Sequence, residues 1–304
     1  MSRKRLTPAR ASATTDAIAN FVSTEYAQKS SVDIYSAGSS GWALMNVVRT
    51  PDGKSFFVKS SRKTSTDMFL GEAEGLKALR HTNSLVVPEV YHAGKLPQGL
   101  GSFIVMEYLD FEHIVNMADL GTKLAEMHLA EPLDPQAKSG KFGFGMDNTI
   151  GGTAQPNDWT EDWVQFFGKH RLQHQLSLAN DRDLSLLGKK LLAKLPEFFE
   201  GVEVKPSILH GDLWSGNYAG CAKGPLIFDP AVYYGHHEAE FGMSWCAGFS
   251  AAFWRAYHKV IPKAPGFEER KELYQLYHYL NHFNLFGGSY YQICIGIMSK
   301  LTNT

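Results

Sequence analysis

Two short apolar segments, each ending at a carboxylate, constrain this chain more than any other feature. The first, Ser207–Leu209, runs into His-Gly-Asp and so delivers Asp212, with Asn217 five residues later. The second, residues 225–228, ends directly at Asp229. Short apolar runs bounded by turn residues are typical of buried strands. The pattern therefore predicts that two carboxylates and an amide oxygen meet at the ends of neighbouring strands.

Phosphoryl transfer uses this combination of groups. A carboxylate accepts the proton of the attacking hydroxyl, and the catalytic loop of kinases has Asp and Asn at the spacing of Asp212 and Asn217. Carboxylate and amide oxygens also suit a Mg²⁺ ion that bridges nucleotide phosphates. We predict Asp212 as the catalytic base, and Asn217 and Asp229 as metal ligands. The alternative is that these side chains only cap local turns.

A lysine and a glutamate in the N-terminal third supply a second part of such a site. Lys59 follows Phe-Phe-Val in a predicted strand, where a buried unpaired ammonium would be costly. A helix is predicted over residues 66–80, with Glu72 on its apolar face and Glu74 on the opposite face. We predict that Lys59 pairs with Glu72 and binds the α- and β-phosphates. The alternative is a lysine on an edge strand that faces water.

Two backbone segments are candidates for holding the rest of ATP. A loop between strands predicted over 33–36 and 42–49 offers amides and hydroxyls to phosphates. It matches G-x-G-x-x-G poorly, so a plain hairpin turn is the alternative. The predicted strand 102–108 ends in a segment that we predict as the hinge for adenine, although it also fits a plain connection between lobes. The candidate residues are Gly38, Ser39, Ser40 and Gly41 in the loop, and Met106, Glu107, Tyr108 and Leu109 in the hinge.

The order of the predicted elements indicates an α+β chain of two lobes. Residues 16–107 are rich in strands and read as an ATP-binding lobe, with a small antiparallel sheet and one key helix. Residues 108–304 form a larger, mostly helical lobe that contains the catalytic loop, the metal-binding Asp and the substrate pocket. A Gly-, Asn- and Pro-rich stretch over 139–158 is predicted as a long functional loop. Residues 1–15 are predicted as a flexible basic N-terminus.

Composition excludes several other classes. The chain has 304 residues and a net charge of −1, so we expect neither nucleic acid nor a membrane as a partner. No apolar stretch approaches the roughly 20 residues that span a bilayer. Its three cysteines form no C-x-x-C pair, which indicates reduced thiols and a cytoplasmic location. The basic, Ser- and Thr-containing segment 1–15 also fits a transit peptide, so the plastid stroma is the alternative.

The residues around the two carboxylates resemble the fructosamine kinase (ketosamine-3-kinase) family, which is related to aminoglycoside phosphotransferases. The most specific stretches are Leu209–Asn217 and Phe228–His236, and the resemblance extends over roughly residues 16–300. Trp214 and the Tyr-Tyr-Gly-His run are not needed for phosphoryl transfer in general, so they distinguish this family. The resemblance implies a protein-kinase-like fold that uses ATP and Mg²⁺.

The resemblance also implies a reaction. Members phosphorylate the 3-hydroxyl of ketosamines, which are ribulosamine or fructosamine adducts of free amines or protein lysines. The phosphorylated adduct decomposes and frees the amine, so the outcome is deglycation. A ketosamine has hydroxyls and a cationic amine, and its pocket should offer polar groups and an aromatic wall. The candidates are Trp214, His236, Glu238, Trp159 and His282, each of which also fits a structural role.

Two other functions fit part of the pattern. An aminoglycoside- or choline-type kinase would use Asp212, Asn217 and Asp229 but leaves residues 233–236 unexplained. A nucleotide-binding pseudokinase is supported only by the altered loop at 37–41. Many family members have Gly-Gly-Gly-Cys there, and that cysteine supports redox-sensitive dimers. Because this loop has no cysteine, we predict a monomer or weak dimer without a redox disulfide.

Overall fold

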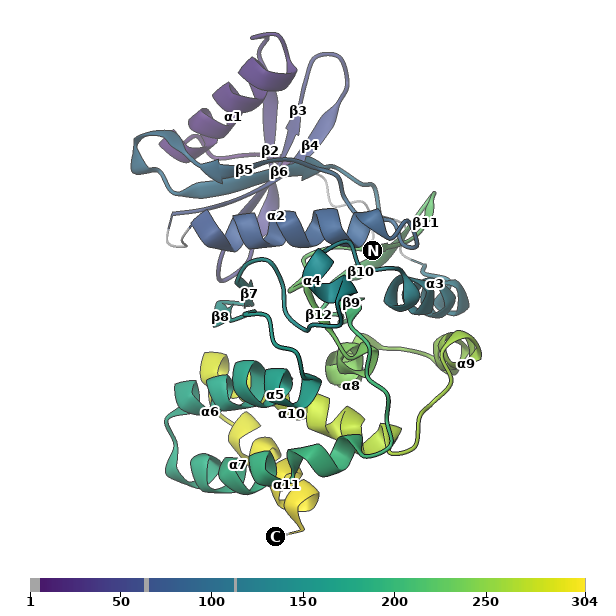
Figure 1. Cartoon of the computed structure of the whole chain (residues 1–304). Coiled ribbons are helices and arrows are strands. Elements are labelled where there is room, and N and C mark those ends of the chain that lie inside the picture. Colours follow the sequence, from purple (N-terminus) through teal and green to yellow (C-terminus); the bar gives the residue numbers. More distant parts are fainter. Residues whose placement is uncertain (1–5, 63–65, 112–113, 304) are drawn as a thin grey trace.

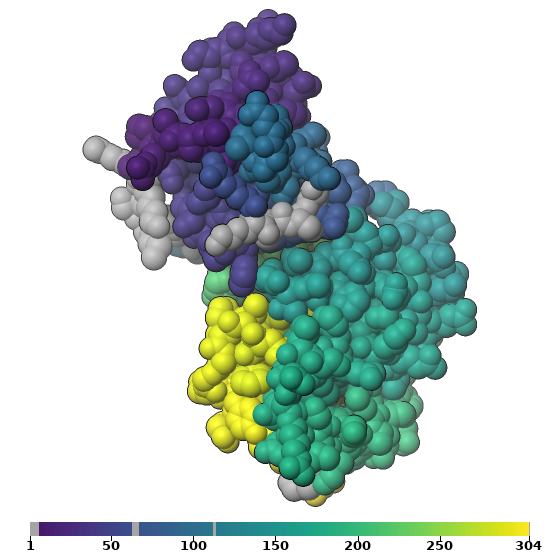
Figure 2. All heavy atoms as spheres, turned by 90° about the vertical axis from the view of Figure 1, so that its left-hand side faces the viewer, coloured from purple at the N-terminus to yellow at the C-terminus, as the bar shows by residue number. Residues whose placement is uncertain are grey.

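The computed structural model describes residues 6–62, 66–111 and 114–303. A twisted sheet with two helices forms an upper lobe, and a larger, mostly helical lobe lies beneath it (Figure 1). We call these the N-terminal and C-terminal lobes. The space-filling view shows the purple and blue N-terminal lobe resting on the teal, green and yellow C-terminal lobe (Figure 2). This is the two-lobed α+β arrangement that the sequence predicts.

The N-terminal lobe is built on one antiparallel sheet of six strands in the order β1-β2-β3-β4-β6-β5. Side chains alternate along each strand. In β4, Phe56 and Val58 therefore pack under helix α1, whereas Phe57 and Lys59 face helix α2 and the C-terminal lobe. The strands are β1 (Thr7–Pro8), β2 (Asp33–Ser39), β3 (Leu44–Arg49), β4 (Ser55–Ser61), β5 (Val90–Lys95) and β6 (Ser102–Glu107).

Two helices cover this sheet. Helix α1 (Ala13–Tyr26) is capped by Ser12, whose hydroxyl accepts the backbone N–H of Thr15 in a capping box. Helix α2 (Thr66–His81) matches the helix predicted over 66–80, and its buried Leu76 and Leu79 lie on the predicted face. A short 3-10 turn, Pro97–Gly99, links β5 to β6.

The start of the chain differs from the prediction of a flexible segment over residues 1–15. Thr7–Pro8 pairs with β2, and α1 begins at Ala13, so the described part of this segment, residues 6–15, belongs to the N-terminal lobe. Residues 1–5 lie outside the described part. The sheet ends at Glu107, which supports the boundary that we place between Glu107 and Tyr108. That boundary remains a proposal.

The C-terminal lobe consists of helices around three two-stranded ribbons, β9 with β12, β10 with β11, and β7 with β8. The ribbon β7–β8 lies inside the stretch 139–158, which is therefore not wholly a loop as predicted. The strands are β7 (Asn148–Ile150), β8 (Thr153–Gln155), β9 (Ser207–Leu209), β10 (Tyr218–Cys221), β11 (Gly224–Ile227) and β12 (Tyr233–Gly235).

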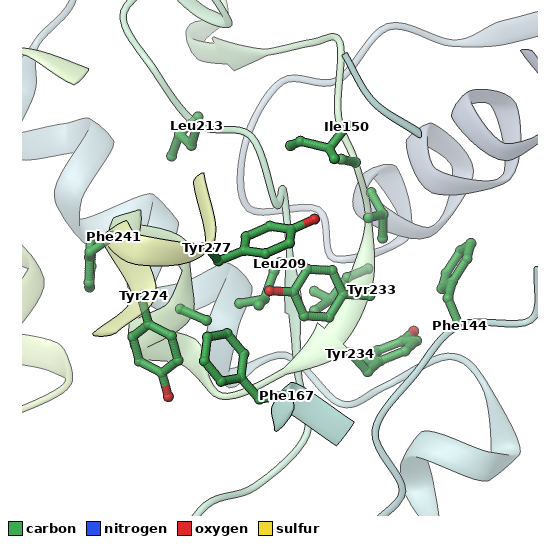
Figure 3. Packing of buried hydrophobic residues seen from close by; sticks show 14 of the residues in the cluster. Phe144, Ile150, Phe167, Leu209, Leu213, Tyr233, Tyr234, Phe241, Tyr274 and Tyr277 are labelled. Atoms are coloured by element: carbon green, nitrogen blue, oxygen red, sulfur yellow. The ribbon is translucent and has the colours of Figure 1, made fainter. Parts of the chain in front are cut away.

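The helices of this lobe enclose an aromatic core. Arg171 is fully buried, with its guanidinium 4.0 Å from the ring centre of Tyr233 and 4.7 Å from that of Phe166. Figure 3 shows Tyr233, Tyr274, Tyr277 and Phe167 gathered in this core. The helices are α3 (Met117–Leu129), α4 (Pro135–Lys138), α5 (Trp163–Phe166), the π-helical turn Phe167–Gln173, α6 (His174–Ala179), α7 (Arg182–Lys194), the 3-10 turns Leu195–Phe199 and His237–Met243, α8 (Ser244–Ala247), α9 (Ala251–Val260), α10 (Phe267–Phe286) and α11 (Tyr290–Thr302).

Helix α2 meets strand β7 and the segment before strand β12 where the lobes join. Gly71 and Gly75 of α2 allow this contact, because a Cβ on Gly71 would lie 2.8 Å from Asn148 Cβ and one on Gly75 would lie 2.8 Å from Val232 Cγ2. The key helix of the upper lobe is thus seated directly on the lower lobe. Within the described residues, no helix is long and apolar enough to cross a membrane.

Candidate active site

The loop after β9 is held in one conformation by backbone contacts. Gly211 has φ +80°, and a Cβ there would lie 2.1 Å from the carbonyl oxygen of Ala231, so only glycine fits. The backbone N–H groups of His210 and Gly211 donate to the buried carboxylate of Glu240, at 2.7 and 3.0 Å. These two bonds fix the turn that presents Asp212.

His210 also braces this loop through its ring. Its Nε2 lies 2.9 Å from the carbonyl oxygen of Phe228, and its Nδ1 lies 3.3 Å from the backbone N of Asp212. Burial lowers the pKa of His210. A neutral ring that donates from Nε2 and accepts at Nδ1 satisfies both contacts. His210 therefore connects the Asp212 loop to the strand that leads to Asp229.

Lys59 joins the two lobes at the centre of the site. Its Nζ lies 2.7 Å from Glu72 Oε1 and 2.6 Å from Asp229 Oδ1. The predicted pair with Glu72 is thus present. Burial alone would lower the pKa of Lys59, but the carboxylates of Asp229 and Glu72 outweigh it and raise the pKa. Desolvation in the cleft opposes ionisation of Asp229, yet the Lys59 ammonium lowers its pKa overall.

Asn217 ties the two carboxylate loops together. Its Nδ2 donates to the backbone carbonyl of Asp212 at 2.9 Å and to that of Asp229 at 3.2 Å, with Asp212 Oδ2 at 3.3 Å. With the amide nitrogen engaged in this way, Oδ1 is left to accept. Asp229 likewise uses Oδ1 for Lys59, and its side chain is 55% exposed. Two oxygens that can ligate a hard cation are therefore present.

Asp212 has the electrostatics of a base held in a poorly solvated place. Burial raises its pKa well above the usual value for Asp, and the nearby carboxylates of Asp229 and Glu240 raise it further. The contact with Asn217 acts in the opposite direction. A carboxylate with a raised pKa accepts a proton more readily than an ordinary one.

A cavity of about 470 Å³ between the lobes contains these groups. The predicted residues that line it are Lys59, Glu72, Asp212, Asn217, Asp229, Ser40, Trp214 and His282. Other predicted residues do not line it. Gly38 and Ser39 lie in β2, and the predicted hinge, Met106 to Leu109, lies outside the cavity wall. The backbone N–H of Glu107 already donates to Glu89 at 2.7 Å, so it is not free for adenine.

The loop that precedes β3 also differs from the predicted phosphate cover. Ser40 Oγ accepts the backbone N–H groups of Trp42 and Ala43, at 3.2 and 3.1 Å. The backbone N–H of Ser40 donates to Ala43 at 2.9 Å. Three of the loop's amides are thus bonded within the loop, and Gly41 does not line the cavity. Among these four predicted residues, Ser40 alone lines the cavity.

Three predicted substrate residues are instead part of the C-terminal core. Glu238 makes a two-pronged ion pair with Arg270, at 2.7 and 2.9 Å, and both side chains are 1% exposed. His236 is buried and bonded through Nδ1 to the hydroxyl of Tyr274 at 2.7 Å. Trp159 stacks on Tyr234. These contacts correct the prediction, because none of the three side chains lines the cavity: Glu238 is buried and paired, His236 is buried, and Trp159 packs against the core.

The structure adds residues that sequence reasoning missed. Trp42 and Trp245 line the cavity, as do Asn148, Cys246 and Asn281. Trp42 directly follows Gly41 of the glycine-serine loop. Its place next to the predicted phosphate-binding loop could therefore have pointed to the cavity. Asn148 lies in the long stretch already predicted to be functional. Nothing in the sequence around Trp245 and Cys246 points to a cavity, because the apolar residues before them fit the hydrophobic core equally well.

Comparisons with known proteins bear on the family of this chain. The sequence profile described as fructosamine kinase matches residues 14–304. The chain is 52% identical over 254 residues to the chloroplastic protein-ribulosamine 3-kinase of Oryza sativa subsp. japonica, covering 81% of this chain and 72% of that one. A candidate fructosamine-3-kinase from Thermobifida fusca superposes with a TM-score of 0.79 at 28% identity, over 95% of this chain and 99% of that one.

A more distant likeness concerns the fold alone. Aminoglycoside phosphotransferase APH(4)-Ia is 14% identical, with a TM-score of 0.59, over 95% of this chain and 98% of that one. It shares the protein-kinase-like arrangement of lobes. The profile match covers nearly the whole chain, including both carboxylate loops and Lys59. This chain therefore belongs to the fructosamine kinase family.

Proposed function

We propose that this protein is an ATP-dependent kinase that phosphorylates the 3-hydroxyl of ketosamines. The observation that carries the proposal is the meeting of Lys59, Asp212, Asn217 and Asp229 in one cavity between the lobes. The rice relative is named a protein-ribulosamine 3-kinase, which supports a ribulosamine or fructosamine adduct as acceptor. Phosphorylation destabilises such an adduct, so the outcome would be deglycation of a free amine or a protein lysine.

Each residue has a separate task in this reaction. Asp212 accepts the proton of the attacking hydroxyl, which strengthens its nucleophilicity as the bond to phosphorus forms. Lys59 neutralises phosphate charge, and Glu72 keeps its ammonium in place. Glu240 and His210 keep the Asp212 loop from moving during transfer. A carboxylate fixed in this way holds the acceptor hydroxyl in line with the phosphate.

The donor set fits Mg²⁺. Asn217 Oδ1 and the second oxygen of Asp229 are hard, uncharged or anionic ligands that project toward the cavity. When bound, Mg²⁺ would neutralise charge on the nucleotide phosphates. Asp229 now bonds to Lys59, so this carboxylate would be shared between the ammonium and the metal. We propose Asn217 and Asp229 as the residues that hold it.

The ketosamine would lie against the aromatic part of the cavity. Trp214 is 39% exposed, and His282 and Trp245 lie side by side with ring centres 5.5 Å apart. Among the described lining residues, the acidic ones are Glu72, Asp212 and Asp229. The cationic amine of a ketosamine therefore has ring faces as its other source of stabilisation. Trp214, Trp245 and His282 are the proposed substrate-contacting residues.

The test is a panel of acceptors with Mg-ATP: a ribulosamine, a fructosamine, an aminoglycoside and choline. We expect transfer to the ketosamines and none to the others. Transfer only to the aminoglycoside or to choline would replace this proposal with the related kinase function. ATP binding without transfer to any acceptor would indicate a pseudokinase.

We propose a location on the basis of the same relative. The rice protein is named chloroplastic, which supports the plastid stroma as the place where this protein acts. The cytoplasm is the alternative. A fluorescent fusion of the full chain in a plant cell separates the two, since stromal fluorescence would coincide with chlorophyll and cytoplasmic fluorescence would surround it.

A further inference from the structure

Trp42 and Gly152 form a close contact between the two lobes. Trp42 lies in the loop between β2 and β3, and Gly152 lies in the two-residue loop between β7 and β8. A Cβ on Gly152 would lie 2.3 Å from Cζ3, 2.6 Å from Cη2 and 2.7 Å from Cε3 of the Trp42 indole. The indole thus rests directly on the backbone of Gly152. Figures 1 and 2 show the loop of the upper lobe reaching down to the lower lobe.

Backbone geometry accounts for Gly151 but not for Gly152. Gly151 has φ +59°, whereas Gly152 is not among the glycines with a positive φ. A positive φ at only the first of two loop positions is the pattern of a type II′ hairpin, which needs glycine at that position alone. A positive φ therefore does not explain the glycine at 152. The missing side chain at 152 instead makes room for the indole.

Both sides of this contact are held firmly. On the upper side, Ser40 Oγ accepts the N–H groups of Trp42 and Ala43 and so shapes the loop. On the lower side, Asn148 Nδ2 donates to the carbonyl of Val232 at 2.7 Å, and Asn281 Nδ2 donates to that of Ile150 at 3.3 Å. The hairpin β7–β8 is therefore held in place by hydrogen bonds, and a side chain from the other lobe can pack on it.

The contact also borders the cavity. Trp42 and Gly151 both line it, together with Lys59 and Asp212. We propose that Trp42 is a positioning residue that closes the cavity by packing on Gly152. This closure keeps the two lobes in a fixed relative position, so that ATP and the acceptor are aligned. It also excludes water from the cavity. The proposal rests on the proposed kinase function.

Closure of this kind has a chemical consequence. Water that reaches the site can replace the acceptor hydroxyl: its oxygen bonds to the γ-phosphorus, the bond to the β–γ bridging oxygen breaks, and ADP, phosphate and a proton are released. Lids that exclude water suppress such hydrolysis and align the reactants. Opening the contact should therefore lower transfer to the acceptor and raise the share of ATP that is hydrolysed.

The test compares Gly152→Ala, Trp42→Ala and the double variant. Each single change should raise the acceptor KM and lower kcat/KM roughly tenfold, and should increase phosphate release per ketosamine phosphorylated. Because both changes break one contact, the double variant should be no worse than Trp42→Ala. Gly296→Ala, at an open position of α11 with nothing within 4 Å, is the matched control and should behave as wild type.

Two results would overturn the proposal. One is wild-type kinetics and wild-type phosphate release in Trp42→Ala, a change in a partly exposed loop that leaves folding intact. The other is a double variant whose loss equals the product of the single losses. A wild-type protein that transfers no phosphate to ketosamines would refute the proposed function instead, and the Trp42–Gly152 coupling would then be read from ATP hydrolysis alone.

Discussion

The Nζ of Lys59 lies 2.6 Å from Oδ1 of Asp229, a residue 170 positions later in the chain. This ion pair links the sheet of the N-terminal lobe to the loop after β11. Glu72 holds the same ammonium from the other side at 2.7 Å. The ion pair that links the lobes therefore also brings together the groups that we propose to bind phosphate.

The first prediction concerns Asp212→Asn. Loss of the base should lower kcat by about 10²- to 10⁴-fold, while the affinity for ATP stays close to that of wild type. Steady-state kinetics and a nucleotide-binding titration check both. An unchanged kcat would remove Asp212 as the base.

The same substitution should stabilise the fold. Because the pKa of Asp212 is raised in the folded state, its contribution to stability is complete below the unfolded pKa and is lost as pH rises through the folded pKa. At neutral pH the charged carboxylate therefore costs stability that Asn does not. We expect a higher Tm for Asp212→Asn at pH 7 without Mg²⁺, and no gain below about pH 4. A lower Tm at pH 7 would contradict this.

The pH dependence of activity follows from the same pKa. Only the deprotonated carboxylate accepts a proton, so kcat/KM should fall as pH falls through the pKa of Asp212 in the free enzyme. Since burial raises this pKa, the fall should begin at a higher pH than for an ordinary Asp. If kcat/KM stayed constant until the pH reached the usual pKa of an aspartate, burial would not be raising the pKa of Asp212.

Glu72 and Glu74 form a matched pair for testing the role of the α2 helix. Glu72→Gln removes a buried charge from Lys59 and should lower kcat/KM for ATP roughly tenfold or more. Glu74 pairs with Lys77 at the surface, at 2.7 Å with both side chains about half exposed, so Glu74→Gln should change little. Equal effects of the two changes would mean that the Lys59–Glu72 pair does not serve ATP.

Glu238 should behave as a structural residue. Glu238→Gln leaves the buried Arg270 guanidinium without its counter-charge and should lower the free energy of unfolding by about 3–5 kcal/mol. The acceptor KM of the folded fraction should not change. Glu268→Gln, at an exposed carboxylate that pairs with Lys263 and Lys271, is the control and should cost at most about 1 kcal/mol. A raised acceptor KM in Glu238→Gln, with an unchanged free energy of unfolding, would mean that Glu238 contacts the substrate after all.

The cysteines should not link two chains. Burial raises the pKa of Cys246 to about 11, and that of Cys294 to about 12, so neither thiol ionises readily near neutral pH. Cys221 is partly buried and lies in β10, away from the loop at 37–41. Size-exclusion chromatography should give the same elution volume with oxidant and with reductant. A dimer that appears with oxidant and is reversed by reductant would contradict the prediction.

The sequence predicted the parts of the site whose spacing carries chemistry. Lys59 is predicted from its place in an apolar strand and Glu72 from helix periodicity, and the structure pairs them because the apolar faces of β4 and α2 are buried. The order of lobes followed from the same patterns.

Long-range contacts explain what could not be predicted. Glu238 and His236 carry the residue types of a substrate pocket, but Arg270 and Tyr274, more than thirty residues away, bury and pair them. Trp42 is the opposite case: it is not among the residues predicted for the site, and its proposed role depends on Gly152 in the other lobe. Sequence patterns report which face of an element is apolar, not which distant element covers it.

The most direct test of the central claim is to locate the transferred phosphate. The protein would be incubated with Mg-ATP and a ribulosamine adduct of lysine labelled with ¹³C at C3, and the product followed by ³¹P and ¹³C NMR. We predict coupling between phosphorus and C3, followed by release of free lysine, with neither signal in Asp212→Asn. Phosphate on another carbon, or transfer that persists in Asp212→Asn, would contradict the account.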